Sequence, residues 1–167
     1  MSENQEKFTK KVVVVTGGAS GIGRAISKAF AQAGASVAVL DVNLEIAQDL
    51  ARELGNGSIA LSCDVTDLTS IDKSISSVIK EYSKIDILVN SAGIALLNPA
   101  ESVTEQEWQK TIDVNLGGTF FVAQRVGKEM LKARSGAIIN LASQAASVAL
   151  TDHVAYCASK FGVFGVT

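Results

Sequence analysis

Short apolar runs alternate with helical patterns along almost the whole chain, and this alternation constrains the fold more than any other feature of the sequence. The run "KVVVVT" at 11–16 is continuous and β-branched, which is typical of a strand buried on both faces. Four further runs predict strands, at 36–41, 58–64 and 136–143 and within 84–93, where the strand ends near Asn90. Helical patterns separate the runs, so the sequence predicts one α/β domain: a doubly wound parallel sheet with helices on both faces.

The helical patterns are defined by apolar spacing and by capping residues. Asn43 is the expected N-cap of a helix ending near Leu54, and a third helix covers 71–82. A capping box, "TEQE" at 104–107, opens a long helical region that is interrupted near 115–118. In the first helix we expect one apolar face, made of Ile22, Ala25, Ile26, Ala29, Phe30 and Ala33.

Composition and charge narrow the function classes. The net charge is −2 and no Lys/Arg run exceeds two residues, so nothing predicts binding to nucleic acid or an anionic membrane. The segment 1–10 is polar and lacks the apolar stretch of a signal peptide, so we expect a cytoplasmic protein whose single domain spans 11–167. We expect Cys63 and Cys157 to be buried thiols, and one His without ligand spacing argues against a metal site.

The segment "TGGASGIG" at 16–23 is a glycine-rich turn between the first strand and the first helix. Backbone N–H groups and the helix dipole at such a turn favour a phosphate group, and glycine lets the backbone approach a pyrophosphate closely. The alternative, a tight turn without a ligand, is equally compatible with this motif alone. The candidate cofactor-binding residues of the turn are Gly17, Ser20, Gly21, Ile22 and Gly23.

Asp41 stands at the end of the second predicted strand, 18 residues after Gly23. Dinucleotide-binding folds place an acid at about this spacing to bind the adenosine ribose hydroxyls. A carboxylate also repels the 2′-phosphate of NADP, and neither 42 nor 43 is basic, so NAD is favoured. Arg24, one residue past the glycine motif, is the feature that speaks for NADP. The alternative reading of Asp41 is a solvated acid at a strand end.

Two more strand ends carry candidate cofactor contacts. The pair Asp64 and Val65 can meet an adenine ring through a carboxylate and a backbone N–H, although an acid at a helix start is an equally good interpretation. The small residues of "NSAG" at 90–93 leave room for a flat cofactor, and Asn90 can equally tie neighbouring strands together. The candidates in this second motif are Asn90, Ala92 and Gly93.

Taken in this order, the motifs resemble the short-chain dehydrogenase/reductase family. They are "TGGASGIG", Asp64-Val65, "NSAG", Asn115, Ser143 and "YCASK", and the resemblance covers 11–167. Ser91 departs from the family's usual NNAG. The chain is also shorter than such domains usually are, so the resemblance implies a Rossmann-type sheet that lacks its last strands. It further implies four catalytic residues, Asn115, Ser143, Tyr156 and Lys160, and a homotetramer or dimer.

The chemistry of these four residues is partly legible from their spacing. Tyr156 and Lys160 lie at i and i+4 on one helix face, and a nearby ammonium lowers the pKa of a tyrosine toward that of a useful base. A polar helix face is the alternative. The resemblance implies that Ser143 orients the substrate and that Asn115 supports a water-mediated proton relay to Lys160, which also binds ribose. His153, near the start of this helix, can touch substrate hydroxyls or be a surface histidine, and we favour the surface histidine.

The resulting expectation is an NAD-dependent dehydrogenase. The loops 94–102 and 144–152 contain no Arg or Lys, so a neutral secondary alcohol or ketone, such as a polyol or sugar alcohol, is the expected substrate. A 3-oxoacyl-(acyl carrier protein) reductase is the alternative within this enzyme class. A non-catalytic dinucleotide-binding module is the alternative outside it.

Overall fold

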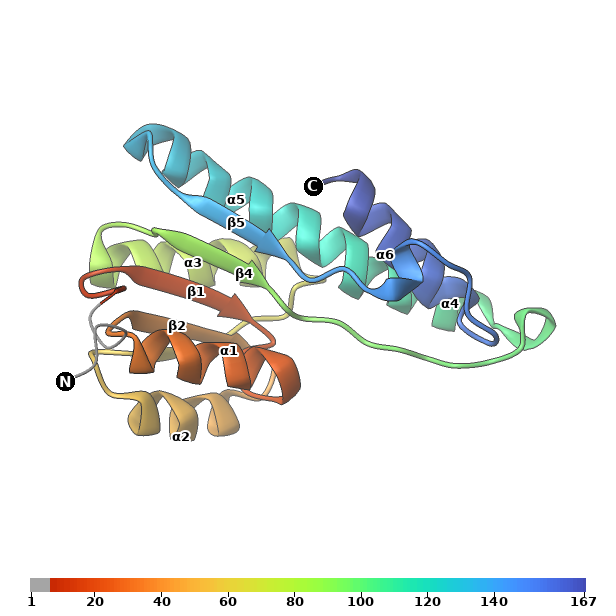
Figure 1. Cartoon of the computed structure of the whole chain (residues 1–167), viewed down its shortest axis with the longest axis horizontal. Coiled ribbons are helices and arrows are strands. Elements are labelled where there is room, and N and C mark those ends of the chain that lie inside the picture. Colours follow the sequence, from red (N-terminus) through yellow and green to blue (C-terminus); the bar gives the residue numbers. More distant parts are fainter. Residues whose placement is uncertain (1–6) are drawn as a thin grey trace.

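A computed structural model describes residues 7–167 of the chain, so residues 1–6 of the predicted polar segment 1–10 lie outside the described residues. Five strands form one sheet in the order β3-β2-β1-β4-β5, and every neighbouring pair is parallel (Figure 1). The predicted doubly wound parallel sheet is confirmed. The strands are β1 (Val12–Thr16), β2 (Ser36–Asp41), β3 (Ile59–Ser62), β4 (Ile87–Asn90) and β5 (Ala137–Asn140).

Helices cover both faces of the sheet and bury alternate residues of each strand. On β1, Val13 and Val15 pack toward α1 (Gly21–Gln32) and α2 (Leu44–Leu54). Val12 and Val14 pack toward α3 (Leu68–Tyr82) and α5 (Gly118–Ala133). Both faces are covered, which is why the strand sequences are continuously apolar and do not alternate. Figure 1 shows α1 and α2 together on one side of the sheet.

Two strands are shorter than the sequence predicts, and a third ends at the predicted residue. The run at 58–64 pairs only over Ile59–Ser62 and the run at 136–143 only over Ala137–Asn140, whereas β4 ends at Asn90 as predicted. Strand pairing stops where the chain turns out of the sheet. The predictions that Asp64 and Ser143 end their strands are therefore wrong, because both lie in the loops that follow.

The buried face of α1 also differs from the prediction. Its buried residues are Gly23, Ser27 and Ala31, whereas Ile22 is 68% exposed. Small residues at i, i+4 and i+8 let the helix approach the strands closely, so the bulkier apolar residues turn aside. Ile26, Phe30 and Ala33 are half-buried, but Ala25 and Ala29 are exposed.

The long helical region is built as predicted around an irregularity. A complete capping box at Thr104 and Glu107 opens α4 (Glu105–Ile112). A π-helical turn, η3 (Asp113–Gly117), joins α4 to α5. Two short 3₁₀ turns, η2 (Ala100–Ser102) and η4 (Gln144–Ala146), lie in the loops, and α6 (Val154–Gly165) closes the chain. Within residues 7–167 no helix is long and apolar enough to cross a membrane.

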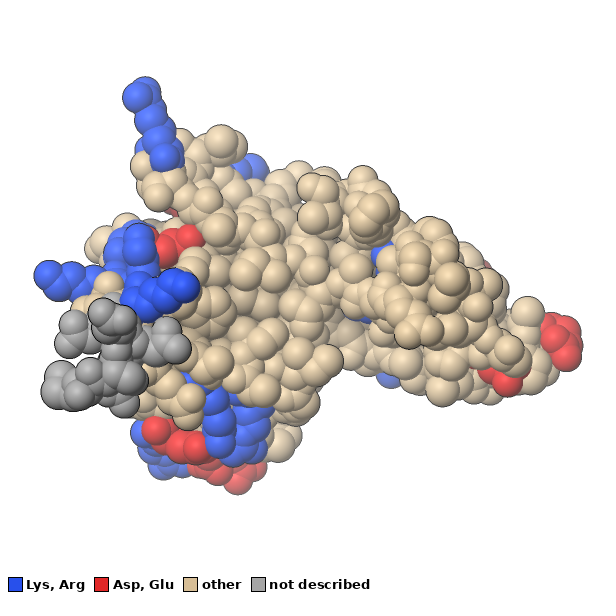
Figure 2. Space-filling view, viewed as in Figure 1, with Lys and Arg blue, Asp and Glu red and all other residues tan. Residues whose placement is uncertain are grey.

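The surface is uneven in charge. Figure 2 shows Lys and Arg gathered at the end that carries the N-terminus, and a largely uncharged surface over α6. The edge strand β5 is partly exposed, with Ile139 at 46%. Cys63 and Cys157 are both free and buried, as predicted.

Candidate active site

The glycine turn after β1 forms a bare backbone cradle at the start of α1. Gly17 and Gly21 have φ of +59° and +50°, a region that favours glycine. A Cβ on Gly23 would lie 2.2 Å from the carbonyl oxygen of Gly17, so no side chain fits there. Ser20 is the N-cap but makes no side-chain capping bond, and the first turn of α1 holds no acid. The first N–H groups of this helix are therefore available to an anion.

Two cavities of about 310 and 380 Å³ adjoin above this cradle, at the carboxyl edge of the sheet. Because they share five lining residues, they form one elongated site, which we call the trough. The shared residues are Gly17, Ser20, Ala92, Gly93 and Ile94. One end adds the predicted residues Gly21, Ile22, Gly23, Tyr156 and Lys160, and the other end adds Asp41, Asp64 and Val65.

The acid end of the trough has one buried and one exposed carboxylate. Asp41 is 9% exposed, and its two oxygens accept hydrogen bonds from the backbone N–H groups of Ala19 and Asn43, each at 3.0 Å. Asp41 therefore braces the glycine turn from the neighbouring strand. Asp64 is exposed and accepts from the N–H of Thr66 at 2.9 Å. Its side chain shapes the loop after β3 while it lines the trough.

The strand order reverses between β1 and β4, and polar side chains hold the chain at this switch point. The hydroxyl of Thr16 accepts from the N–H groups of Ser91 and Ala92, at 3.1 and 3.2 Å. Asn90 donates to the Oδ1 of Asn140 at 2.9 Å and is 3% exposed. Asn90 lines neither cavity, so in this structure it ties β4 to β5, the alternative that the sequence left open.

The opposite end of the trough carries a tyrosine and a lysine from α6. The Nζ of Lys160 lies 5.8 Å from the centre of the Tyr156 ring and donates to the carbonyl oxygen of Leu141 at 2.7 Å. Lys160 is only 7% exposed, and this burial lowers its pKa. An ammonium held in this way is fixed in place next to the phenol and still faces the trough.

Asn115 lies inside the π-helical turn and connects three segments. Its side chain accepts from the N–H of Ile94 at 2.8 Å and donates to the Ile94 carbonyl at 2.9 Å. It also donates to the hydroxyl of Ser159 at 3.0 Å. The backbone carbonyl of Asn115 accepts from the hydroxyl of Thr119 at 2.7 Å. The predicted irregularity is thus present, and the Asn115 side chain joins the loop after β4 to α6.

Ser159 is a further residue of the site, and it was not among the predicted ones. It is fully buried, accepts from Asn115 and donates to the backbone carbonyl of Tyr156 at 2.7 Å. The available signal was its place within "YCASK", three residues after Tyr156 on the same helix. Its partner Asn115 lies 44 positions earlier, and sequence spacing does not indicate that contact.

Two residues near α6, Ser143 and His153, do not line the trough. Ser143 is three residues past β5, where its hydroxyl caps η4 by accepting from the N–H of Ala145 at 3.1 Å. It lines neither cavity of the trough. His153 is half-buried, and its ring stands edge-on to that of Tyr156 with the centroids 6.0 Å apart. His153 is thus partly exposed beside Tyr156, and its two readings, a surface histidine and a contact for substrate hydroxyls, stay predictions.

Comparison with known proteins agrees with this geometry. A model of the short chain dehydrogenase family matches residues 11–167. The chain belongs to this family. Among curated members, it is 54% identical to a D-threitol dehydrogenase of Mycolicibacterium smegmatis over 160 residues, which are 94% of this chain and 62% of that protein. It is 46% identical to an NAD-dependent glycerol dehydrogenase of Listeria innocua, over 96% of this chain and 63% of that protein.

A solved structure gives the same result for the fold of this short-chain dehydrogenase. The crystal structure of gox2181 superimposes with a TM-score of 0.93 at 34% identity, and the match covers 99% of this chain and 67% of that chain. The chain therefore spans about 62–63% of the length of the two curated relatives described here. The dehydrogenase part that it contains holds the glycine cradle, the acid end and the Tyr156–Lys160 end of the trough.

Proposed function

We propose that this chain carries the cofactor-binding and acid/base part of an NAD-dependent dehydrogenase that acts on neutral secondary alcohols, above all polyols. One observation carries the proposal: a single trough contains a buried acid at one end and a phosphate cradle next to it, and leads from them to a tyrosine and a lysine at the other end. A dinucleotide needs the first pair of features. Oxidation of an alcohol needs a base at the position of the second pair.

The residues of the trough fit a nicotinamide dinucleotide. The cradle has no space for a Cβ at Gly17 or Gly23, where the nearest backbone atoms would lie 2.8 and 2.2 Å away, so the bare backbone faces the trough. We assign the diphosphate to Gly17, Ser20, Gly21, Ile22 and Gly23, the adenosine to Asp41, Asp64 and Val65, and the nicotinamide riboside to Ala92, Gly93, Tyr156 and Lys160. When bound, the nicotinamide ring supplies the hydride acceptor for alcohol oxidation.

NAD suits the acid end better than NADP. Within residues 7–167, Asp41 has no cationic partner, so its charge would oppose a 2′-phosphate. The one basic residue near the glycine motif, Arg24, pairs with Glu53 on α2 at 3.2 Å, and Lys28 pairs with the same carboxylate at 2.6 Å. Glu53 thus holds both cations at the outer side of α1. The ribose hydroxyls of NAD are donors that the Asp41 carboxylate can accept.

The remaining roles follow from the chemistry of the side chains. Tyr156 takes the proton of the alcohol, and the Lys160 ammonium beside its ring favours the phenolate form that does so. Lys160 also binds a ribose hydroxyl. Ser143 orients the substrate oxygen, and Asn115 supports the path by which the proton leaves. Ser159 holds Tyr156 at the right place relative to Asn115.

A polyol is the proposed substrate because the outer loops carry no basic residue and are joined by a hydrogen bond. The loops 94–102 and 144–152 contain no Arg or Lys, and the N–H of Asn98 donates to the carbonyl of Asp152 at 3.0 Å. A carboxylate or phosphate on the substrate would find no cation there. The names of the two curated relatives, a threitol and a glycerol dehydrogenase, support the same substrate class.

Nicotinamide absorbance tests this function directly. We expect reduction of NAD, and much slower reduction of NADP, with D-threitol, glycerol and sorbitol. A preference for NADP together with reduction of a 3-oxoacyl thioester would support the acyl-carrier reductase instead. NADH binding without turnover of any alcohol would support the dinucleotide-binding module. Assembly as a homotetramer or dimer and a cytoplasmic location belong to the same proposal, and light scattering tests the first.

A further inference from the structure

We propose that Nε2 of His153 accepts a hydrogen bond from a substrate hydroxyl next to the reacting carbon, which makes His153 a specificity-determining residue for polyols. This inference rests on the proposed dehydrogenase function and deepens it by assigning recognition of the second hydroxyl. It starts from the position of the His153 ring, which stands edge-on to the ring of Tyr156.

His153, Tyr156 and Lys160 form one stripe along α6. Their spacing of three and then four residues places them on the same helix face. Tyr156 is the middle member, with the Lys160 ammonium 5.8 Å from its ring and the His153 ring centroid 6.0 Å away. Lys160 and Tyr156 line the trough, whereas His153 does not. The imidazole therefore lies on the opposite side of Tyr156 from Lys160, the side on which we expect a substrate to extend beyond its reacting carbon.

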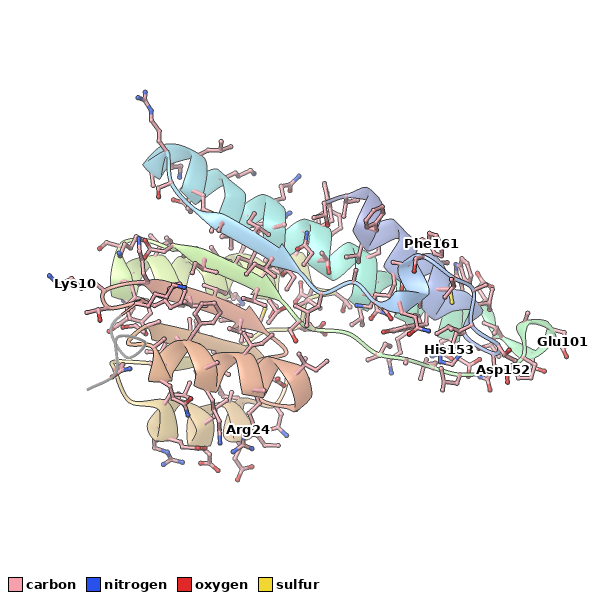
Figure 3. The ribbon with its side chains drawn as sticks, in the orientation of Figure 1. Lys10, Arg24, Glu101, Asp152, His153 and Phe161 are labelled. Carbon is pink, nitrogen blue, oxygen red and sulfur yellow. The ribbon has the colours of Figure 1, made fainter. Side chains whose placement is uncertain are left out.

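The backbone around His153 is fixed where the two outer loops meet. The N–H of His153 donates to the carbonyl of Leu150 at 3.3 Å. The preceding residue, Asp152, accepts from the N–H of Asn98 in the other loop at 3.0 Å. Figure 3 shows Asp152 and His153 next to each other near the loop that carries Glu101. The imidazole is thus held at the junction of the loops that flank the substrate.

One contact indicates which ring nitrogen of His153 carries the hydrogen in the neutral imidazole. Nδ1 of His153 contacts the carbonyl oxygen of Thr151. A carbonyl oxygen only accepts, so Nδ1 must carry the hydrogen, and the neutral ring then presents Nε2 as an acceptor. Among residues 7–167 no protein donor engages Nε2. An acceptor at this position favours a ligand that brings its own donor.

A polyol brings such a donor and the competing substrate classes do not. The carbon next to the reacting centre of a polyol carries a hydroxyl, which can donate to Nε2. A simple secondary alcohol has only hydrogens there. A 3-oxoacyl thioester offers only further carbonyl acceptors, which would leave the imidazole nitrogen unpaired. One hydrogen bond of this kind corresponds to a preference of about fivefold.

Turnover of two matched alcohols tests the inference. 2,3-Butanediol differs from 2-butanol by a single neighbouring hydroxyl, so the ratio of their kcat/KM values isolates its recognition. In His153→Phe, which keeps an aromatic ring beside Tyr156, we expect the ratio to fall about fivefold. His153→Gln retains an amide acceptor at the far end and should restore most of it. Val154→Ala, at an exposed neighbouring position, is the control that should leave the ratio unchanged.

A second readout does not depend on turnover. The chain has one histidine, so the imidazole ¹⁵N resonances of the untagged protein report on His153 alone. With NADH bound, 2,3-butanediol should shift the Nε2 resonance, and 2-butanol should not. An equal response to both alcohols, or an unchanged ratio in His153→Phe, overturns the inference while the proposed function stands. A wild-type protein that oxidises neither of these alcohols nor D-threitol overturns both.

Discussion

The two edges of the sheet use the same residue type in opposite ways. At the carboxyl edge, Asp41 accepts two backbone N–H groups and has no cationic partner among residues 7–167. At the amino edge, Asp86 accepts from the N–H of Val12 at 2.9 Å and pairs with Lys11 and Lys84 at 3.2 and 2.8 Å. Two lysines neutralise the charge of Asp86 at the amino edge, whereas the charge of Asp41 stays available beside the trough.

The edges differ in the same way in their backbone. An uncapped helix N-terminus, that of α1, lies beside the trough at the carboxyl edge. At the amino edge, Asp86 links three strands through its main chain as well, because its N–H donates to Val12 and its carbonyl accepts from Ala137. At the amino edge, the polar groups of Asp86 therefore make contacts within the protein. The carboxyl edge keeps helix N–H groups and a carboxylate available to a ligand. Substitutions at the two edges should separate these effects.

The largest effect is expected at Tyr156. Tyr156→Phe removes only the hydroxyl that exchanges a proton with substrate, so kcat should fall about 1,000-fold. NADH affinity, measured by fluorescence titration, should stay within about twofold, because the ring and Lys160 remain. Tyr82→Phe is a control: the Tyr82 hydroxyl donates to Gly57 at the far side of the sheet. Retained turnover in Tyr156→Phe would remove Tyr156 from the mechanism.

Asp41→Ala tests the free acid of the carboxyl edge. Loss of a charged acceptor for the ribose hydroxyls should weaken NAD binding about tenfold. NADP should lose less, because the repulsion of its 2′-phosphate disappears with the carboxylate. The dissociation constants of NAD and NADP, measured for wild type and for Asp41→Ala, test this difference between the cofactors. Equal losses for both cofactors would mean that Asp41 acts only by bracing Ala19 and Asn43.

Ser159→Ala tests whether the link between Asn115 and α6 positions Tyr156. The variant loses two hydrogen bonds, one to the Tyr156 carbonyl and one from Asn115, and we expect kcat to fall at least about fivefold with little change in the KM for NAD. Ser74→Ala is a matched control, since Ser74 is a buried helical serine that donates to the carbonyls of Ser62 and Ser70 at 2.9 Å. Both variants should melt at similar temperatures. A fall in kcat in both would indicate a general loss of stability instead.

Sequence patterns predict these features unequally, and the reason is distance along the chain. The glycine turn, the capping box and the Tyr156–Lys160 pair depend on neighbours within one or two helical turns, so spacing alone indicates them. The link from Asn90 to Asn140 joins residues 50 positions apart and has no local signature. The ends of β3 and β5 are overestimated because a sequence pattern does not show where neighbouring strands diverge. Long-range contacts such as that between Asn90 and Asn140 hold together the strands whose carboxyl ends lie at the trough.

The smallest effect on function, and a measurable one on stability, is expected at Asp86. Burial raises the pKa of this carboxyl, but hydrogen bonds from Lys84, the Val12 N–H and Lys11 outweigh it, so the pKa is lowered overall. Asp86→Asn should reduce the free energy of unfolding by about 1 kcal/mol at pH 7, because Asn can still accept from Val12 but has no charge for the half-exposed lysines. NADH affinity should not change, since the amino edge is remote from the trough.

The pH dependence of this stability difference tests whether the charge of Asp86 is its cause. A carboxyl whose folded pKa is lowered stabilises the protein above its unfolded pKa, which is near 3.9, and loses this contribution as the pH falls through the folded value. Denaturant unfolding of wild type and Asp86→Asn should therefore differ at pH 7 and converge as the pH is lowered from about 4 to 2. A difference that persists at low pH would mean that the shape of the Asp86 side chain, and not its charge, stabilises the amino edge.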